Sequence, residues 1–403
     1  MRAAKATSCC IAGGGPAGIM LGYLLARAGV ETCVLEKHGD FLRDFRGDTI
    51  HPSTLEVMFE LGILDEFLQR PHQEAPQLRG LVGESELILA DFAHVPTHCH
   101  FIALMPQWDF LNFIVEQARR YPAFQLKMNS EVTGLIEEAG EIRGVRGTSS
   151  SEPFEIRAKL VIGADGRHSQ VREAAGLTVD DFGAPIDVLW FRISRHAGDP
   201  SLPFGRIDQG KIMVLLDRTD YWQCGFVIPK GAAGDIKKAG LDKFRKMIAD
   251  LAPFLNDRVP ELASWDDIKL LTVKVDRLRQ WYRPGLLCIG DSAHAMSPVG
   301  GVGINLAIQD AVAAANILAE PLRNGSIQTS DLKRVQQRRE FPTKLTQKFQ
   351  IAIQNRVIGR VLSSTGKTKL PGLLRILRHW PYLRRIPARF IGIGVRPEHV
   401  STR

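Results

Sequence analysis

Cysteine is scarce in this chain, and its six cysteines are not spaced like the ligands of a metal site. They form no CxxC pair and no Cys/His cluster, which disfavours a structural metal centre and a redox disulfide. Four of them lie in short apolar runs, where buried reduced thiols are common. The cysteines therefore predict no bound metal, and we expect a cytoplasmic protein.

Long apolar runs are missing as well. The stretch 8–12 is too short for the apolar core of a signal peptide, and no segment reaches the roughly 18 apolar residues that span a bilayer. Hydrophobic residues make up 44% of the chain and charged residues 24%, the balance of an ordinary globular protein. A chain of 403 residues has room for two or three domains of about 150 residues each.

Acidic residues nearly disappear towards the C-terminus. Residues 322–403 hold 18 basic and three acidic side chains, a charge of +15, whereas the rest of the chain holds 34 basic and 41 acidic ones, or −7. A general nucleic-acid binder spreads basic charge over a binding face, so we expect no nucleic-acid partner. The segment is expected to form helices that break at its prolines, which are Pro342, Pro371, Pro381 and Pro387.

Two interpretations of this basic C-terminal region remain open. Its apolar residues, including Trp380, Tyr382 and Phe390, alternate with arginines, and such a composition can lie on an anionic membrane surface. The same composition can form a helical cap, whose apolar face covers the body of the protein while the arginines stay in water. We favour the cap over peripheral membrane contact.

The first 36 residues predict a strand, a glycine-rich turn, a helix and a second strand. The turn has the spacing G-x-G-x-x-G at Gly13, Gly15 and Gly18. The first glycine permits the tight turn, the second lets the backbone approach a pyrophosphate, and the third lets helix and strand pack closely. Glu36 ends the second strand and is placed to accept hydrogen bonds from a ribose diol. We predict a dinucleotide site with phosphates at the helix N-terminus, a pattern common to NAD and FAD.

Two later strand ends carry glycine and aspartate motifs. The strand 159–163 runs into Ala-Asp165-Gly166, and the strand 285–289 runs into Gly290-Asp291. Both are expected at the carboxyl edge of an open α/β sheet, where ligands bind. A helix follows the second motif, and its positive N-terminal end would stabilise the negative charge that flavin reduction places at N1 and O2.

Together these segments resemble the FAD-dependent aromatic hydroxylase family, the single-component flavoprotein monooxygenases typified by para-hydroxybenzoate hydroxylase. Order and spacing match along residues 7–320. The resemblance implies bound FAD, NADPH or NADH as a transient co-substrate, and hydroxylation of a small aromatic molecule by O2 through a C4a-hydroperoxyflavin. Pro298 is implied to shape the active site through its backbone carbonyl. The implied FAD contacts are Gly13, Gly14, Gly15, Pro16, Ala17, Gly18, Glu36, Lys37, Arg46, Gln107, Val132, Asp165, Gly166, Arg172, Gly290, Asp291, Pro298, Gly301, Gly303, Ile304 and Asn305.

The predicted fold is α/β, with a Rossmann-like FAD-binding domain, an inserted antiparallel-sheet substrate domain and a C-terminal helical region. The domains are expected at 1–71, 101–176 and 276–320 for FAD, at 72–100 and 177–275 for the substrate sheet, and at 321–403 for the helices. Strand alternation places Trp190 and Arg192 on one face of a strand, and Gln223 and Gly225 on one face of a neighbouring strand. For each of the four, both pocket lining and ordinary sheet packing stay open.

Other functions remain as alternatives. A flavin-dependent reductase of a prenyl or polyene lipid would share the FAD fold, as would a non-catalytic flavin-binding protein. Asp291, Ser292 and His294 are too close in sequence to be assumed a hydrolase triad. The residues do not indicate the oligomeric state.

Overall fold

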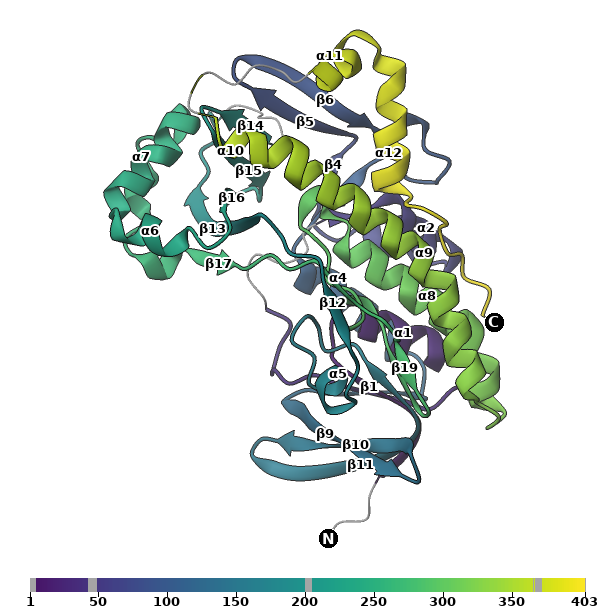
Figure 1. Ribbon diagram of the computed structural model, residues 1–403. Coiled ribbons are helices and arrows are strands. Elements are labelled where there is room, and N and C mark those ends of the chain that lie inside the picture. Colours follow the sequence, from purple (N-terminus) through teal and green to yellow (C-terminus); the bar gives the residue numbers. More distant parts are fainter. Residues whose placement is uncertain (1–4, 43–48, 200–204, 365, 367–371, 403) are drawn as a thin grey trace.

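The computed structural model describes residues 5–42, 49–199, 205–364, 366 and 372–402. Two sheets dominate it, and long helices lie along one side of the larger sheet (Figure 1). The large sheet has the strand order β19-β20-β11-β1-β2-β8, and a β9–β10 hairpin extends it from β11. Its strands are β1 (Lys5–Ala12), β2 (Thr32–Leu35), β8 (Phe124–Lys127), β9 (Ser130–Glu138), β10 (Glu141–Ser149), β11 (Glu152–Gly163), β19 (Tyr282–Arg283) and β20 (Leu286–Cys288).

Parallel pairing brings the strand ends that carry the sequence motifs to one edge of this sheet. β1 pairs in parallel with both β2 and β11, so that Ala12 lies opposite Leu35 on one side and Gly163 on the other. β20 continues the row, with Cys288 opposite Gly163. Because parallel strands point the same way, the segments that follow these residues all emerge at the same carboxyl edge.

Helices cover one face of the large sheet with closely spaced apolar residues, which form the main hydrophobic core. α1 (Pro16–Arg27) packs against α4 (Gln107–Ala118) and α8 (Gly303–Arg323), and α8 packs in turn against α9 (Thr329–Ile353). The length and apolar composition of α8 would suit a membrane span, but 83% of its apolar window is buried inside the protein. α8 is therefore a core helix. All six cysteines are buried free thiols.

The second sheet has the order β17-β13-β16-β15-β14-β5-β6. Its strands are β5 (Gln77–Val82), β6 (Ser85–Asp91), β13 (Ile186–Ser194), β14 (Gly205–Asp208), β15 (Lys211–Asp217), β16 (Tyr221–Pro229) and β17 (Lys269–Leu271). The expected antiparallel sheet contains one exception, because β14 and β5 pair in parallel where two distant segments meet. One face is closed by α7 (Leu241–Leu251), whose Phe244 contacts Phe191 and Phe226.

Shorter elements connect these parts. A three-stranded sheet has the order β3-β7-β4, and a two-stranded ribbon pairs β12 with β18. The bounds are β3 (Thr49–Ile50), α2 (Pro52–Glu60), α3 (Leu64–Leu68), β4 (Gln73–Ala75), β7 (Ile102–Leu104), α5 (Gln170–Ala174), β12 (Val179–Asp181), α6 (Ala233–Lys238) and β18 (Asp276–Leu278).

The C-terminal region is helical, but its first helix does not break where the sequence suggested. α9 runs through Pro342 to Ile353, continues as a π-helical turn (Gln354–Ile358) and ends in α10 (Gly359–Leu362). The expected break at Pro342 is wrong because that proline is buried in a long helix held by tertiary packing, and Thr346 donates its hydroxyl hydrogen bond to the Pro342 carbonyl at 2.8 Å.

Two further helices, α11 (Gly372–His379) and α12 (Arg385–Gly392), follow and lie over β6 (Figure 1). Pro371 lies outside the described residues. Pro381 opens a short 3-10 turn between the two helices, and Pro387 lies in the first turn of α12, where proline is tolerated.

Candidate functional site

The glycine-rich turn between β1 and α1 forms a cradle, in which some glycines are required for packing and another leaves space for a ligand. Gly13 has a φ of +107°, and a Cβ there would lie 2.3 Å from the Ala164 carbonyl oxygen. A Cβ on Gly18 would lie 2.0 Å from the Gly13 carbonyl oxygen, so these two positions require glycine for packing. A Cβ on Gly15 would instead meet no described atom within 4 Å, and no described side chain caps α1. Open space before an uncapped helix N-terminus fits a pyrophosphate.

Glu36 follows β2 and is buried beside this turn. Its carboxylate accepts hydrogen bonds from the backbone N–H of Gly14 at 2.9 Å and of His38 at 3.1 Å. These bonds hold the carboxylate at the turn, and an ionised carboxylate has about four acceptor positions in all. The predicted bond to a ribose diol remains a prediction.

Asp165, at the end of β11, organises the turn into α5. Its carboxylate accepts a hydrogen bond from the Ser169 hydroxyl and another, of 3.1 Å, from the Val171 N–H. Burial raises the pKa of Asp165, while these hydrogen bonds act in the opposite direction. The side chain therefore shapes the motif loop, whether or not it also contacts a cofactor.

Arg172 joins the two aspartate motifs. Its guanidinium donates to the Ser292 carbonyl at 3.2 Å and to the Arg167 carbonyl at 2.8 Å. Arg167 in turn places a guanidinium nitrogen 3.8 Å from the carboxylate of Asp291, whose side chain is 36% exposed. Arg167 was not among the predicted site residues, although its place directly after Asp165-Gly166 marked it as a neighbour of that loop.

The side-chain amide of Asn305, in the first turn of α8, makes its hydrogen bonds to other groups of the protein. The amide oxygen accepts from the His51 N–H at 2.9 Å and from the Thr54 hydroxyl at 2.7 Å. The amide nitrogen donates to the carbonyls of Thr49 at 3.2 Å and Gly301 at 3.3 Å. Any contact with flavin is therefore left to the backbone N–H of this residue, at a helix end that no described side chain caps.

His294 is part of a buried charged network and not of a hydrolase triad. Its Nε2 lies 2.6 Å from the Asp310 carboxylate, which also accepts from the Gly290 N–H at 3.0 Å and from Arg339 at 2.9 Å. The Ser292 hydroxyl points to backbone carbonyls, and the described residues include no hydrogen bond between Ser292 and His294. The network fixes Gly290 at the start of the second aspartate motif.

The second sheet brings the four predicted substrate residues onto one face. In the pairing of β13 with β16, Trp190 lies opposite Gly225 and Arg192 lies opposite Gln223. A Cβ on Gly225 would lie 3.0 Å from the Trp190 ring, so the indole covers the glycine backbone. Arg192 stacks over the Tyr221 ring at 4.8 Å. Together they form an aromatic and cationic surface on the sheet face opposite α7.

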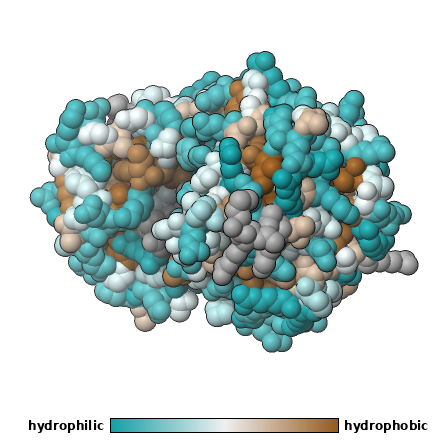
Figure 2. Space-filling model, turned by 90° about the horizontal axis from the view of Figure 1, so that it is seen from below, coloured by the Kyte–Doolittle hydropathy of each residue, from teal (hydrophilic) through white to brown (hydrophobic). Residues whose placement is uncertain are grey.

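Charge interactions link this face to the FAD-binding part of the chain. Arg218, in the turn after β15, donates to the Gln223 amide oxygen at 3.4 Å. Burial raises the pKa of Asp109, in the first turn of α4, and the charges of Arg70 and Arg218 oppose that rise. On the surface seen from below, hydrophobic residues gather in a hollow on the side of α6 and α7 (Figure 2).

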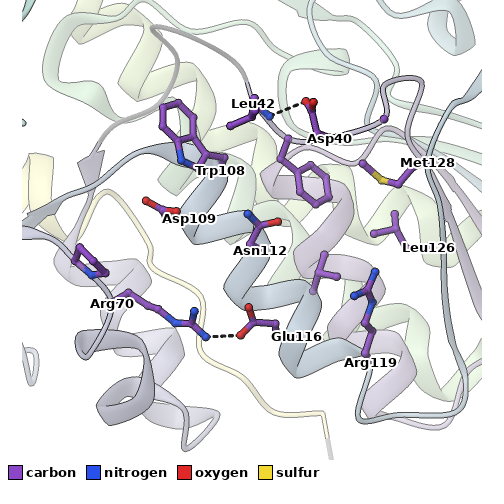
Figure 3. Close-up of a pocket in the computed structure, with 14 residues that line it drawn as sticks. Asp40, Leu42, Arg70, Trp108, Asp109, Asn112, Glu116, Arg119, Leu126 and Met128 are labelled. Carbon is purple, nitrogen blue, oxygen red and sulfur yellow. Dashed lines mark hydrogen bonds and ion pairs between the residues drawn. The ribbon is translucent and has the colours of Figure 1, made fainter.

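A separate cavity of about 480 Å³ lies between α4 and the segment that follows Glu36 (Figure 3). Trp108 and Asp109 lie at one end of it, and the ion pair of Arg70 with Glu116 lies at the other. Among the described residues, none of those predicted for FAD lines this cavity. Gln107 is the residue before Trp108 and begins α4.

The remaining predicted residues have varied environments. Lys37 is exposed, whereas Val132 is buried in a core cluster below the sheet. Pro298 is half-buried and precedes a 3-10 turn (Val299–Gly301), where a Cβ on Gly301 would lie 2.4 Å from the Thr49 hydroxyl. Arg46 lies outside the described residues. Pro16, Ala17, Gly166 and Gly303 lie at the strand ends and helix starts already described.

A family model described as an FAD binding domain matches residues 6–348. The chain is 33% identical over 363 residues to 6-methylpretetramide 4-monooxygenase of Streptomyces rimosus, covering 90% of this chain and 85% of the relative. It is 29% identical to anhydrotetracycline monooxygenase of the same species, over 75% of this chain, and spans only 60% of that relative's length. These relatives are monooxygenases, which supports hydroxylation over the reductase and binding-protein alternatives.

Solved structures share the fold. PnpA, the p-nitrophenol 4-monooxygenase of Pseudomonas putida, superposes with a TM-score of 0.74 at 20% identity, over 97% of this chain and all of PnpA. PqsL of Pseudomonas aeruginosa gives a TM-score of 0.74 at 20% identity, over 89% of this chain and 99% of PqsL. With the glycine cradle and the paired aspartate motifs at one sheet edge, these matches lead to one conclusion. The chain belongs to the FAD-binding-domain family of flavoprotein monooxygenases and is an FAD- and NAD(P)H-dependent aromatic hydroxylase.

Proposed function

We propose that this enzyme hydroxylates a fused polycyclic phenol, of the kind that the names 6-methylpretetramide and anhydrotetracycline denote. The observation that carries this proposal is the 33% identity to 6-methylpretetramide 4-monooxygenase across nearly the whole chain. Identity to the para-nitrophenol 4-monooxygenase of Pseudomonas sp. WBC-3 is lower, at 24% over 341 residues. A fused ring system is therefore favoured over a single-ring phenol.

The face of the second sheet supports a flat aromatic ligand. Trp190 offers an indole beside Gly225, where the missing side chain leaves the ring close to the backbone. Aromatic rings attract one another in offset or edge arrangements, worth about 1 kcal/mol beyond their area. Arg192 lies two residues along the same strand and offers a cation to a phenolate oxygen.

When bound, FAD supplies the activation of O2 that transfers one oxygen atom to the ring. The chain would hold it with the glycine cradle at Gly13, Gly15 and Gly18 and with the Asp291 loop. The uncapped N-terminus of α8 would place partial positive charge near the flavin ring. The second sheet would cover the reacting ring and exclude water from it.

Oxidation of NADH and NADPH by the purified enzyme tests the substrate proposal. Fused-ring polyphenols should stimulate oxidation in air and gain one oxygen atom by mass, and para-nitrophenol should stimulate it far less. The proposal fails if only single-ring phenols are hydroxylated. The same assay establishes which nicotinamide cofactor is preferred.

The FAD contacts have a test of their own. Asp291→Ala should be purified with less FAD, and its FAD-free form should melt at the wild-type temperature, because Asp291 is partly exposed and, among the described residues, forms only a loose ion pair of 3.8 Å with Arg167. Full FAD occupancy in this variant would contradict the site.

Although the sequence alone favours a helical cap, we also propose that the basic C-terminal region contacts an anionic membrane surface. The segment formed by α11, α12 and the turn between them exposes Ile376, Trp380, Tyr382 and Ile386, of which the last three are 67% to 70% exposed. Arginines lie among them, and the sequence 341–397 contains no acidic residue. Apolar and aromatic residues among unopposed arginines suit the headgroup boundary of anionic lipid, whereas a second copy would bring arginine against arginine.

Flotation with vesicles tests this contact. The full chain should float with phosphatidylglycerol vesicles and not with phosphatidylcholine vesicles, and the double variant Trp380→Ala, Ile386→Ala should float less. Leu270→Ala is the control, because Leu270 is 49% exposed on a different part of the surface. If the full chain floats with neither vesicle, the C-terminal helices are only a cap.

A further inference from the structure

The segment 294–302, which carries Pro298, is held by side chains and not by a sheet. It connects the Asp291 loop to α8 and contains only the 3-10 turn Val299–Gly301. Backbone polar groups in such a segment need partners from elsewhere when they are buried. In this chain many of those partners come from one face of α9 and the π-helical turn that follows it.

Three glutamines supply these partners. The Gln350 amide nitrogen donates to the carbonyls of Ser297 at 2.9 Å and Val299 at 2.8 Å, and its oxygen accepts from the Ser297 N–H at 3.2 Å. The Gln354 amide donates to the Ser297 hydroxyl at 2.6 Å. The Gln347 amide donates to the Ala295 carbonyl at 3.1 Å and, one segment away, to that of Asp276 at 2.8 Å.

The burial of these amides shows that they are not incidental surface contacts. Gln347, Gln350 and Gln354 are at most 2% exposed, and their spacing of three and four residues puts them on one helix face. Immobilising a glutamine side chain costs up to about 2 kcal/mol of conformational entropy, and burying its amide requires that the hydrogen bonds lost to water be replaced. Gln354 also begins the π-helical turn, a departure from α-helix that is frequent at functional sites.

The segment these amides hold would shift easily without them. Gly300 and Gly301 both have positive φ, at +80° and +63°, and carry no side chain that could anchor the turn, whose far end is held by the hydrogen bonds of Thr49 and Asn305 to the Gly301 carbonyl. Ser297, one residue before Pro298, donates one of the glutamine hydrogen bonds through its N–H and accepts two through its carbonyl and hydroxyl. The position of Pro298 therefore depends directly on Gln350 and Gln354.

We propose that Gln350, assisted by Gln354, is a positioning residue that fixes the Pro298 segment against the flavin and so determines how much of the oxygen consumed reaches the aromatic substrate. The inference rests on the proposed FAD contacts of residues 298–305. A displacement of about 1 Å in a positioning element can cost as much as ~100-fold in rate. Both residues lie just beyond the stretch 6–348 that the family model matches.

The chain offers a matched control in the same helix. Gln336 is also buried, accepts from the Trp281 N–H at 3.0 Å and donates to the Arg279 carbonyl at 3.0 Å. Gln336→Met and Gln350→Met each remove a buried amide with backbone partners, so both should lower the melting temperature. Only Gln350→Met should shift the flavin absorption bands and divert NAD(P)H electrons to O2 as hydrogen peroxide, with a fall in product per NAD(P)H of roughly tenfold.

Hydrogen exchange in the FAD-free protein gives a readout that does not depend on activity. Amides 297–302 should lose protection in Gln350→Met and keep it in Gln336→Met. In the wild type, added FAD should protect 298–305, and failure of that protection would refute the FAD contacts. If FAD protects these amides but Gln350→Met matches Gln336→Met in exchange, spectrum and peroxide yield, the positioning role is refuted. Gln354→Met, which removes one hydrogen bond, should give a smaller shift in the same direction and serves if Gln350→Met does not fold.

Discussion

Replacing Gly15 with alanine should weaken FAD binding while the protein stays folded. The backbone at Gly15 has a φ of −77° and a ψ of −176°, which alanine adopts without strain. The new methyl group would meet no described protein atom within 4 Å. It would instead occupy the open space before α1, where the pyrophosphate is expected. The change therefore separates cofactor binding from folding.

The expected magnitudes follow from that geometry. A hydrogen bond to a charged group contributes about 1.5–3 kcal/mol, so losing one backbone contact to the pyrophosphate should raise the FAD dissociation constant roughly 10- to 100-fold. Alanine is a poorer N-cap than glycine, which costs up to about 1 kcal/mol of stability. Gly18→Ala is the contrasting variant, because its Cβ would lie 2.0 Å from the Gly13 carbonyl oxygen. That overlap should cost about 3 kcal/mol.

The assay is FAD titration of the FAD-free protein by flavin fluorescence, beside urea unfolding of the same samples. Gly15→Ala should lose affinity with a nearly unchanged urea midpoint, whereas Gly18→Ala should lose stability first. If Gly15→Ala binds FAD as tightly as the wild type, the pyrophosphate does not approach this turn and the cradle has been misassigned.

Three further results are expected. Arg258→Met should lower stability by about 3–5 kcal/mol in urea at pH 7, because it leaves the buried carboxylate of Asp199 without the guanidinium that bonds both its oxygens at 2.7 and 2.8 Å. Hydrogen bonds from Arg258 hold the pKa of Asp199 well below its ordinary 3.8, so this stability is present above that pH and is lost progressively as the pH falls from 3.8 through the lower folded-state value. The variant should accordingly lose less stability than the wild type between pH 7 and pH 3, and an equal loss would contradict the assignment. Gly225→Val should displace the Trp190 indole, which a Cβ would approach to 3.0 Å, and raise KM for the aromatic substrate without changing FAD content; an unchanged KM would exclude this face from substrate binding. Burial raises the pKa of Cys99 to about 11 and raises those of Cys9, Cys224 and Cys288 further. A thiol reagent at pH 8 should therefore react far faster with urea-unfolded protein than with native protein, and the absorbance of the thiolate that the reagent releases measures this difference.

The parts of the site that could be predicted from sequence are those set by local geometry. The spacing of Gly13, Gly15 and Gly18 predicts a turn because the tight turn, the space for the pyrophosphate and the close packing of helix on strand all depend on glycines within the same 20 residues. Strand-end logic placed Asp165 and Asp291 at one edge, and the parallel register of β1, β11 and β20 brings their loops together. Strand alternation likewise predicted the shared face of Trp190 and Arg192.

The contacts that sequence analysis missed join segments far apart in the chain. Arg167 approaches Asp291 across 124 positions, and Gln350 holds Ser297 across 53. The sequence indicates such contacts only weakly, because a glutamine at helical spacing can be either a buried partner of backbone groups or a solvated surface residue. Only the packing of α9 against the segment before α8 distinguishes the two. The error at Pro342 has the same origin, since propensity describes an isolated helix and the buried surroundings of α9 outweigh it.

The far end of the chain is also tied to the site by buried charge. Glu398 accepts from Arg338 at 2.7 Å and from Arg339 at 3.2 Å, and Arg339 donates in turn to Asp310. The other oxygen of Asp310 holds the Gly290 N–H, at the start of the Asp291 loop. Buried ion pairs add little net stability over apolar residues of the same volume, but loss of one partner is costly. Such a network therefore acts chiefly on geometry. Together with the glutamines of α9, it makes the basic C-terminal region a support for both ends of the segment from Gly290 to α8.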